Sequence, residues 1–372
     1  MENLNSVCFV SKINKIESIE GADKIELCTI NGWTSVTQKG IHKEGDLILC
    51  LTTDAVIPED LSKKWNVINY LRNGNRVRTV KLRGVYSECI LIPQIDVKRT
   101  FRDGDDLMTF LGIFKYEPPV KNIQLSNGKT RKYKGNPLFE IYYKFPNQKN
   151  VPNMFNDDSD VVITKKMHGT NCRYGIVKKS KLSFLDRIKK FLGNKWIEFE
   201  YIYGSHNVEK GSDSQGFYDI DVWNTIAENY KIKDKLWKFI LDNYTPKSLG
   251  SGIILYGEIF GQGIQKNYDY GLITLKIESF DIQLNGSYLC DNEFQIINKD
   301  LNICDTVEYL YTGKWSKSIQ DSLVFNKYID GTKIPHEGVV VKCIDGDRRK
   351  ISKVINPEYL TYGEKNGTTD SH

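Results

Sequence analysis

The sequence lacks the features of a membrane-spanning or secreted chain. No apolar run approaches the roughly 20 residues that a helix needs to cross a bilayer. Residues 1–5 carry neither the basic stretch nor the apolar core of a secretory signal. The eight cysteines are scattered without a Cys-x-x-Cys pair, so neither a zinc ribbon nor a disulfide framework is predicted. These absences predict an intracellular protein whose cysteines mostly act as small hydrophobic residues.

What the chain does contain is the composition of an ordinary globular protein. Of its 372 residues, 40% are hydrophobic and 27% are charged, and 52 Lys and Arg against 47 Asp and Glu give a net charge of +5. A chain of this length can form two domains, each with its own core. The mild excess of positive charge is compatible with a phosphate-rich partner, but a uniformly solvated basic surface has the same sum.

The N-terminal part has the pattern of a small β-barrel. Apolar and polar residues alternate over residues 25–29, Asn31-Gly32 predicts a tight hairpin turn, and residues 33–37 return as the partner strand. Further strands are predicted at residues 47–51 and 88–93. Several short strands joined by turns indicate an OB-like fold.

Four cations in this part are predicted to contact RNA. Arg76 and Arg78 are two residues apart, so they would lie on one face of a strand with Val77 on the other. Lys81 and Arg83 follow in the same segment. OB barrels bind nucleic-acid strands through cationic faces of this kind. The alternative is an ordinary solvated strand face.

An apolar run further along the chain leads into a small polar turn that carries a lysine. Residues 161–164 predict a buried strand. Gly169, with the Thr-Asn that follows it, bends the chain and lets the backbone approach a ligand. Lys166 lies between these two features, at the rim of a sheet, where it is placed to be a nucleophile. A surface lysine at a strand end is the alternative.

Two carboxylates later in the chain each accompany an apolar run. Glu258 lies within residues 253–261 between glycines, and Glu337 precedes Gly-Val-Val-Val. A charge in a buried strand needs a partner, because leaving it alone costs several kcal/mol. For Glu258, a core carboxylate paired with an arginine is the alternative to a ligand-binding role.

These segments resemble the motifs of the covalent nucleotidyltransferases, in the order that this superfamily has. Lys166-Met167-His168-Gly169 matches motif I, Lys-x-(Asp/His)-Gly, in the histidine form typical of RNA ligases. Residues 5–95 also resemble the OB-like module that precedes the catalytic domain in one family of ATP-dependent RNA ligases. The segments that resemble motifs Ia, III, IIIa, IV and V contain His206, Glu258, Phe280, Glu337 and the pair Lys350 and Lys353.

The chain departs from the family pattern at three of these places. Lys165 stands where Glu is common, and His206 stands where Arg is usual. The two lysines of motif V are commonly separated by one residue, whereas Lys350 and Lys353 are separated by two. The change at Lys165 is expected to make selection of the nucleotide base less strict.

The resemblance implies a three-step reaction. Lys166 would attack the α-phosphorus of ATP to form lysyl-AMP, AMP would pass to an RNA 5′-phosphate, and an RNA 3′-hydroxyl would displace AMP. His168, Lys350 and Lys353 are implied as the other catalytic residues, with His168 acting in the RNA-joining steps. Glu337 and Glu258 would hold Mg²⁺ or Mn²⁺. The residues implied to bind the nucleotide are Thr164, Lys166, Gly169, Asn171, His206, Glu258 (ribose hydroxyls), Phe280 (adenine stacking), Glu337, Lys350 and Lys353.

The predicted architecture is α+β. An OB-like RNA-binding domain is expected over residues 1–113 and a linker over 114–156. Residues 157–372 are expected to form an adenylyltransferase domain of the ligase type, ATP-grasp-like and built on antiparallel sheets. No further domain is expected after motif V, which favours RNA ligases over an mRNA capping guanylyltransferase or a DNA nick ligase. A non-catalytic OB-type RNA-binding protein is a further alternative. We expect a monomer that binds RNA and ATP and no membrane.

Overall fold

The computed structural model describes residues 5–72, 75–97, 99–116, 135–206, 209–210, 221–344 and 349–366. The chain divides into two compact units, each made of separate stretches of sequence. Unit 1 comprises Met1–Pro119, Phe145–Lys166 and Tyr309–His372, and unit 2 comprises Val120–Lys144 and Met167–Glu308. These units follow strand pairing rather than chain order, so they do not coincide with the segments 1–113, 114–156 and 157–372 into which the sequence was divided.

The N-terminal part of unit 1 contains the hairpin that Asn31-Gly32 predicts. β3 (Ile25–Ile30) pairs with β4 (Trp33–Gln38), and Asn31 has a φ of 53°. Asparagine tolerates this left-handed conformation, which a tight hairpin turn requires.

The other strands of this part are short and antiparallel. The central one is β5 (Leu47–Thr52), which lies between β1 (Cys8–Lys12) and β11 (Cys89–Pro93). Alternate side chains of these strands bury two apolar cores on their two sides. The remaining elements are β2 (Lys15–Ser18), β6 (Ala55–Val56), α1 (Glu59–Lys64), β7 (Leu71–Arg72), β8 (Arg76–Val77), β9 (Val80–Leu82), β10 (Val85–Ser87), α2 (Met108–Leu111) and β12 (Phe114–Lys115).

The C-terminal part of unit 1 is a four-stranded antiparallel sheet in the order β20-β13-β21-β22. Its strands are β13 (Asp160–Lys166), β20 (Tyr309–Lys314), β21 (Gly338–Cys343) and β22 (Ile351–Ile355), accompanied by α7 (Lys317–Val324) and α8 (Pro357–Asn366). Val161, Ile163, Val339 and Val341 form much of its core. β13 therefore extends two residues beyond the predicted end at residue 164 and includes Lys166.

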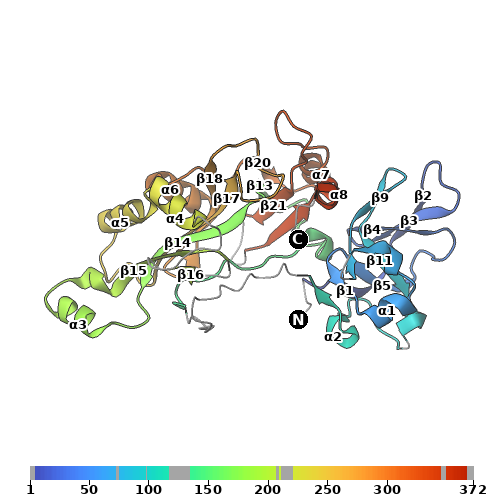
Figure 1. Ribbon diagram of the computed structural model, residues 1–372, viewed down its shortest axis with the longest axis horizontal. Coiled ribbons are helices and arrows are strands. Elements are labelled where there is room, and N and C mark those ends of the chain that lie inside the picture. Colours follow the sequence, from blue (N-terminus) through green and yellow to red (C-terminus); the bar gives the residue numbers. More distant parts are fainter. Residues whose placement is uncertain are drawn as a thin grey trace. The chain divides into compact units, whose positions relative to one another are not determined.

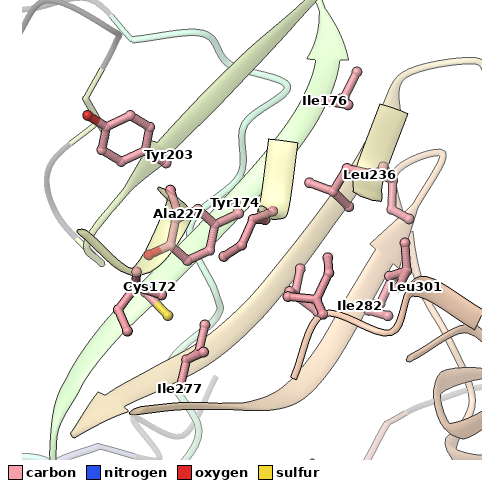
Figure 2. Close-up of a cluster of buried hydrophobic side chains, with 14 of the residues drawn as sticks. Cys172, Tyr174, Ile176, Tyr203, Ala227, Leu236, Ile277, Ile282 and Leu301 are labelled. Atoms are coloured by element: carbon pink, nitrogen blue, oxygen red, sulfur yellow. The ribbon is translucent and has the colours of Figure 1, made fainter. Parts of the chain in front are cut away.

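Unit 2 is built on a six-stranded antiparallel sheet in the order β16-β15-β14-β17-β18-β19. Helices of this unit lie against β14, β17 and β18 (Figure 1), and the interface between helices and sheet is filled by side chains such as Cys172, Tyr174, Leu236 and Ile282 (Figure 2). The elements are β14 (Thr170–Lys178), α3 (Phe184–Phe191), β15 (Phe199–Gly204), β16 (Glu209–Lys210), α4 (Val222–Asn229), α5 (Ile232–Asn243), β17 (Gly252–Gly261), β18 (Leu275–Leu284), β19 (Ser287–Tyr288) and α6 (Asp291–Leu301).

Three smaller findings bear on the sequence-based expectations. Residues 139–145, within the segment expected to be a linker, contain no strand, and the side chains of Phe139 and Tyr142 in this segment are buried. All eight cysteines are free and five are buried, as predicted. No helix within the described part of the chain is long and apolar enough to cross a membrane.

Candidate active site

Lys166 of unit 1 forms an ion pair at the end of its strand. Its Nζ lies 2.6 Å from Oε1 of Glu337. Register brings the two together, because Lys166 is opposite Gly338, the first residue of β21, and Glu337 directly precedes that glycine. The Glu337 side chain is only 5% exposed, compared with 24% for Lys166. The predicted nucleophile and the predicted metal ligand are therefore neighbours, and the amine is partly accessible to a substrate.

Lys353 lies in the same sheet, on the strand beyond Glu337. It is opposite Val340 in β21, and its backbone N–H donates to the Pro146 carbonyl at 3.0 Å. The neighbouring motif V lysine differs, since Lys350 is exposed and precedes β22. The two lysines that the sequence assigned to motif V therefore differ in position, since Lys353 lies within β22 and Lys350 lies before it.

The charge of Lys353 is perturbed by its surroundings. Burial, together with the like charges of Lys115 and Lys166, lowers the pKa of Lys353 to about 7, despite the opposing effect of Glu337 and Asp54. A lysine with this pKa exchanges its proton near neutrality, unlike an ordinary lysine. Unit 1 therefore places a proton-exchanging amine close to the predicted nucleophile.

Thr164, the remaining predicted nucleotide ligand of unit 1, is 2% exposed in the middle of β13. Its position two residues before Lys166 puts both side chains on the same face of the strand. The structure gives it a place beside the nucleophile, and its proposed contact with nucleotide stays a prediction.

In unit 2, the turn that contains His168 is held by the loop between β17 and β18. The His168 backbone N–H donates to the Tyr270 hydroxyl at 2.6 Å, and the His168 ring meets the edge of Tyr268 with centroids 4.7 Å apart. Gln265 Nε2 donates to the Gly169 carbonyl, also at 2.6 Å. His168 is consequently buried, at 4% exposure, and fixed in position. Sequence reasoning did not find Gln265, Tyr268 or Tyr270, because nothing local links this loop to a turn about 100 residues earlier.

Gly169 and Asn171 lie against Glu258. A Cβ atom at position 169 would clash with the Ile259 carbonyl oxygen and lie 3.0 Å from Glu258 Cγ, so only glycine fits. Asn171 is opposite Glu258 in the ladder of β14 and β17. Its buried Oδ1 has no hydrogen-bond partner among the described residues. An unsatisfied buried oxygen of this kind suits a ligand that supplies a donor, such as a hydroxyl.

Glu258 also has a second carboxylate opposite it. Glu258 in β17 is in register with Glu278 in β18, which puts the two side chains on one face of the sheet about 5 Å apart at Cβ. Like charges in this arrangement are destabilising unless hydroxyl donors or a cation lie between them. Glu278 is thus a candidate site residue that sequence reasoning missed, although it lies within the segment that resembles motif IIIa.

Phe280 is held by a tyrosine from the segment that was predicted to be a linker. The two rings of Phe280 and Tyr142 meet edge to face with centroids 5.0 Å apart. The Tyr142 hydroxyl donates to Asp281 Oδ2 at 2.8 Å, and Asp281 is fully buried. Asp281 could have been recognised as a carboxylate in an apolar strand, as Glu258 was, whereas Tyr142 is 139 residues away from it.

His206 lies in the bend that follows β15 and is half-buried. Arg173 of β14 supports this bend by donating from Nε to the Ser205 carbonyl at 3.1 Å. The replacement of the usual arginine at position 206 therefore lies in an anchored loop, and its role toward phosphate stays a prediction.

The cationic strand face predicted from Arg76 and Arg78 is not formed. β8 ends at Val77, and Arg76 is 8% exposed, ion-paired with Asp54 and stacked at 4.1 Å over the Tyr116 ring. The prediction from a spacing of two residues required a longer, solvated strand. It could not reveal the ion pair with Asp54, because Asp54 is distant in sequence.

The other two predicted RNA ligands are exposed on a hairpin. Lys81 lies in β9, with its Nζ 4.9 Å from the centroid of the Tyr86 ring, and Arg83 lies in the turn with a φ of 50°. RNA contact at this hairpin stays a prediction for Lys81 and Arg83.

The donor set at Glu337 fits a magnesium or manganese ion that is held mainly by substrate and water. Among the described residues, no three His, Cys, Asp or Glu side chains gather into a metal-binding group. Mg²⁺ is usually bound through one or two carboxylates together with phosphates and waters, rather than by a complete protein cage. A single buried carboxylate beside the nucleophile meets that requirement.

Comparison with known protein families decides the assignment. A family model for RNA ligases matches residues 159–355, which is more than half of the chain. The chain belongs to the RNA ligase family. A model of an OB-fold domain matches residues 7–94, so the predicted OB-like module and the antiparallel ligase domain are both confirmed.

Solved structures of an RNA ligase from Naegleria gruberi share this fold. A mutant without ligand has 22% identity and a TM-score of 0.73, over 97% of this chain and 99% of that chain. A mutant with ATP and Mn has the same identity and TM-score over 96% and 99%. The same ligase with pyrophosphate has a TM-score of 0.72 at 22% identity, over 97% and 99%. Among curated protein sequences, none matches this chain.

Proposed function

We propose that this RNA ligase uses ATP to join an RNA 3′-hydroxyl to an RNA 5′-phosphate, with Lys166 as the nucleophile. The observation that carries the proposal is the ion pair between Lys166 and the buried Glu337, next to a lysine whose pKa is close to neutral. The ATP and Mn complexes of the Naegleria ligase support the choice of nucleotide and metal. We further propose that the enzyme works as a monomer inside the cell, where ATP and RNA are present.

In the first step, Lys166 Nζ forms a bond to the α-phosphorus of ATP, and the bond to the β-phosphate oxygen breaks to release pyrophosphate. Nζ must first give its proton to solvent water, which reaches the partly exposed Lys166 side chain. Glu337 Oε1, 2.6 Å away, accepts the hydrogen bond of the amine and holds it at the strand end. Positioning a reactant in this way supplies a large part of the acceleration of a phosphoryl-type transfer.

The second and third steps use the stored adenylate. An oxygen of the RNA 5′-phosphate attacks the phosphorus of lysyl-AMP, and the amine of Lys166 leaves and takes up a proton. The RNA 3′-hydroxyl then attacks the activated 5′-phosphate, loses its proton and displaces AMP. We assign His168 to these joining steps, because its backbone is fixed by Tyr270 and its ring by Tyr268.

Lys353 stabilises the negative charge on the transferring phosphate when it is protonated. Its pKa of about 7 means that the approach of a phosphate, an opposite charge, shifts it toward the charged form. A preorganised cation in a partly buried site stabilises developing charge more than a solvated one does. A divalent metal at Glu337 would add Lewis-acid stabilisation of the same charge.

The choice of nucleotide and the choice between RNA and DNA ends distinguish this proposal from its alternatives. Purified protein would be given ATP or GTP, Mg²⁺ or Mn²⁺, and a panel of 5′-phosphorylated RNA and DNA ends with labelled strands. Joined RNA with ATP, absent in Lys166→Ala, is the expected result. Preferential joining of DNA would indicate a nick ligase. Transfer of GMP without joining would indicate a capping enzyme, and binding of RNA without either reaction would indicate a non-catalytic protein.

A further inference from the structure

Helix α3 exposes its apolar face instead of burying it. The helix begins with a capping box formed by Ser183 and Asp186. None of its residues is buried, and Figure 1 shows it extending beyond the ends of β14 and β15. Phe191 is 90% exposed and Phe184 is 77% exposed. The other exposed apolar side chains of this segment are Leu185, Ile188 and Leu192.

Ion pairs on the opposite side of α3 turn the apolar face outward. Lys179 Nζ lies 3.1 Å from Asp186 Oδ1, and Lys190 Nζ lies 2.6 Å from Glu198 Oε1. At about 100° per residue, Asp186 and Lys190 fall on the side away from the apolar residues, which occupy an arc of about 120°. The polar side is thus tied to the segments before and after the helix, and the apolar side is left for a partner.

The same segment has a net positive charge as large as that of the whole protein. Residues 178–198 contain seven Lys and Arg and two acidic residues, which gives +5, equal to the +5 of the complete chain. Arg187 and Lys189 fall at the two borders of the apolar arc and are both exposed. The partner that this surface complements is therefore anionic and also offers flat or apolar groups.

We propose that this α3 surface, residues 178–198, binds an unpaired segment of the RNA substrate. Phe184 and Phe191 are seven residues apart on one face, about 10 Å along the helix, which is about the rise of three stacked bases. Surfaces for single-stranded nucleic acid combine exposed aromatic rings, on which bases stack, with cations that contact the phosphates. The proposal rests on the proposed ligase function and adds a substrate-binding surface separate from the lysine chemistry.

Replacement of the two rings by leucine tests the role of stacking. Phe184→Leu/Phe191→Leu keeps the apolar surface, and leucine is a better helix former than phenylalanine. We expect the dissociation constant for an unstructured oligoribonucleotide, measured by fluorescence anisotropy, to rise about five-fold or more for each lost ring. The matched variant Phe184→Tyr/Phe191→Tyr should bind as tightly as wild type, because it keeps both rings.

A charge variant tests the phosphate contacts separately. Lys189→Gln should make the negative slope of log affinity against log salt shallower by about 0.7, the value for one phosphate contact on a single strand. Lys238→Gln is the control, because Lys238 lies on α5 of the same unit with a side chain that is 75% exposed. It should leave the slope unchanged.

Self-adenylylation distinguishes a failure of this proposal from a failure of the ligase function, since the first step needs no RNA. All the α3 variants should label with ATP as wild type does. Equal RNA affinity of the leucine variant and wild type would overturn the α3 proposal while leaving the ligase function intact. Binding of wild type to phosphatidylserine vesicles, retained by the leucine variant, together with unchanged RNA affinity, would assign the surface to lipid instead.

Discussion

Replacing Lys353 by methionine tests whether the pKa of Lys353 is close to neutral in the folded protein. Methionine has a similar length and volume but cannot be protonated. In the wild type, burial beside Lys115 and Lys166 favours the neutral amine in the folded state, with a pKa of about 7. The unfolded chain has an ordinary lysine, with a pKa of about 10.4. Between these values the unfolded state binds more protons, so the wild type must become more stable as pH rises.

The size of this effect follows from the two pKa values. At pH 7 the folded state holds about half a proton on Lys353, at pH 9 it holds almost none, and the unfolded state holds about one throughout. Integrating the difference at 1.36 kcal/mol per proton and pH unit gives a gain of about 2 kcal/mol between pH 7 and pH 9. Solvent reaches part of the side chain, so this is an upper value.

Urea unfolding of wild type and Lys353→Met at pH 7, 8 and 9 measures this gain. Other titrating groups contribute to both proteins, so the quantity of interest is the change in the difference between them. We expect the wild type to gain up to about 2 kcal/mol on the variant over this range. A difference that stays constant with pH, or one that moves in the opposite direction, would refute the assignment of a near-neutral pKa to Lys353.

Three further substitutions probe contacts described above. Tyr270→Phe should lower the free energy of unfolding by about 1–3 kcal/mol, measured by urea unfolding, because it leaves the His168 N–H without its acceptor; sealing should fall more than self-adenylylation. Gly169→Ala should abolish sealing in the labelled-strand assay. It should also lower the free energy of unfolding by about 1–3 kcal/mol in urea, since the added Cβ meets the Ile259 carbonyl. An unchanged free energy of unfolding would contradict that clash. Arg76→Gln should cost about 3–5 kcal/mol in urea unfolding by leaving Asp54 buried without its partner, whereas equal stability to wild type would show that the pair is dispensable.

The elements of the active site were predictable where the signal was local. An apolar run before a lysine predicted β13, although the strand continues through Lys166. The carboxylate that precedes the next apolar run was recognised as a site residue, and Glu337 indeed lies beside Lys166. Gly169 was expected to let the backbone approach a ligand, and the structure shows that position 169 has no space for a Cβ atom because the Ile259 carbonyl and Glu258 lie against it. Order of the motif segments along the chain then gave the family.

Contacts between distant parts of the sequence were not predictable. Period-two spacing placed Arg76 on a solvated face, and only the fold shows that Asp54 neutralises it. Likewise, Tyr142 was assigned to a linker, although it holds Phe280 and donates to Asp281. The capping box and the apolar spacing of residues 183–192 are visible in the sequence, but periodicity shows only that one face of α3 is apolar, not whether anything covers it.

Locating the adenylate on the chain tests the central claim most directly. The protein would be incubated with ATP and Mg²⁺, digested under mildly alkaline conditions that preserve a phosphoramidate, and analysed by tandem mass spectrometry. We predict AMP on the side chain of Lys166, with loss of the adduct after brief acid treatment and no adduct in Lys166→Ala. AMP on Lys353 or any other residue, or an unmodified Lys166 in protein that seals RNA, would contradict the proposed mechanism.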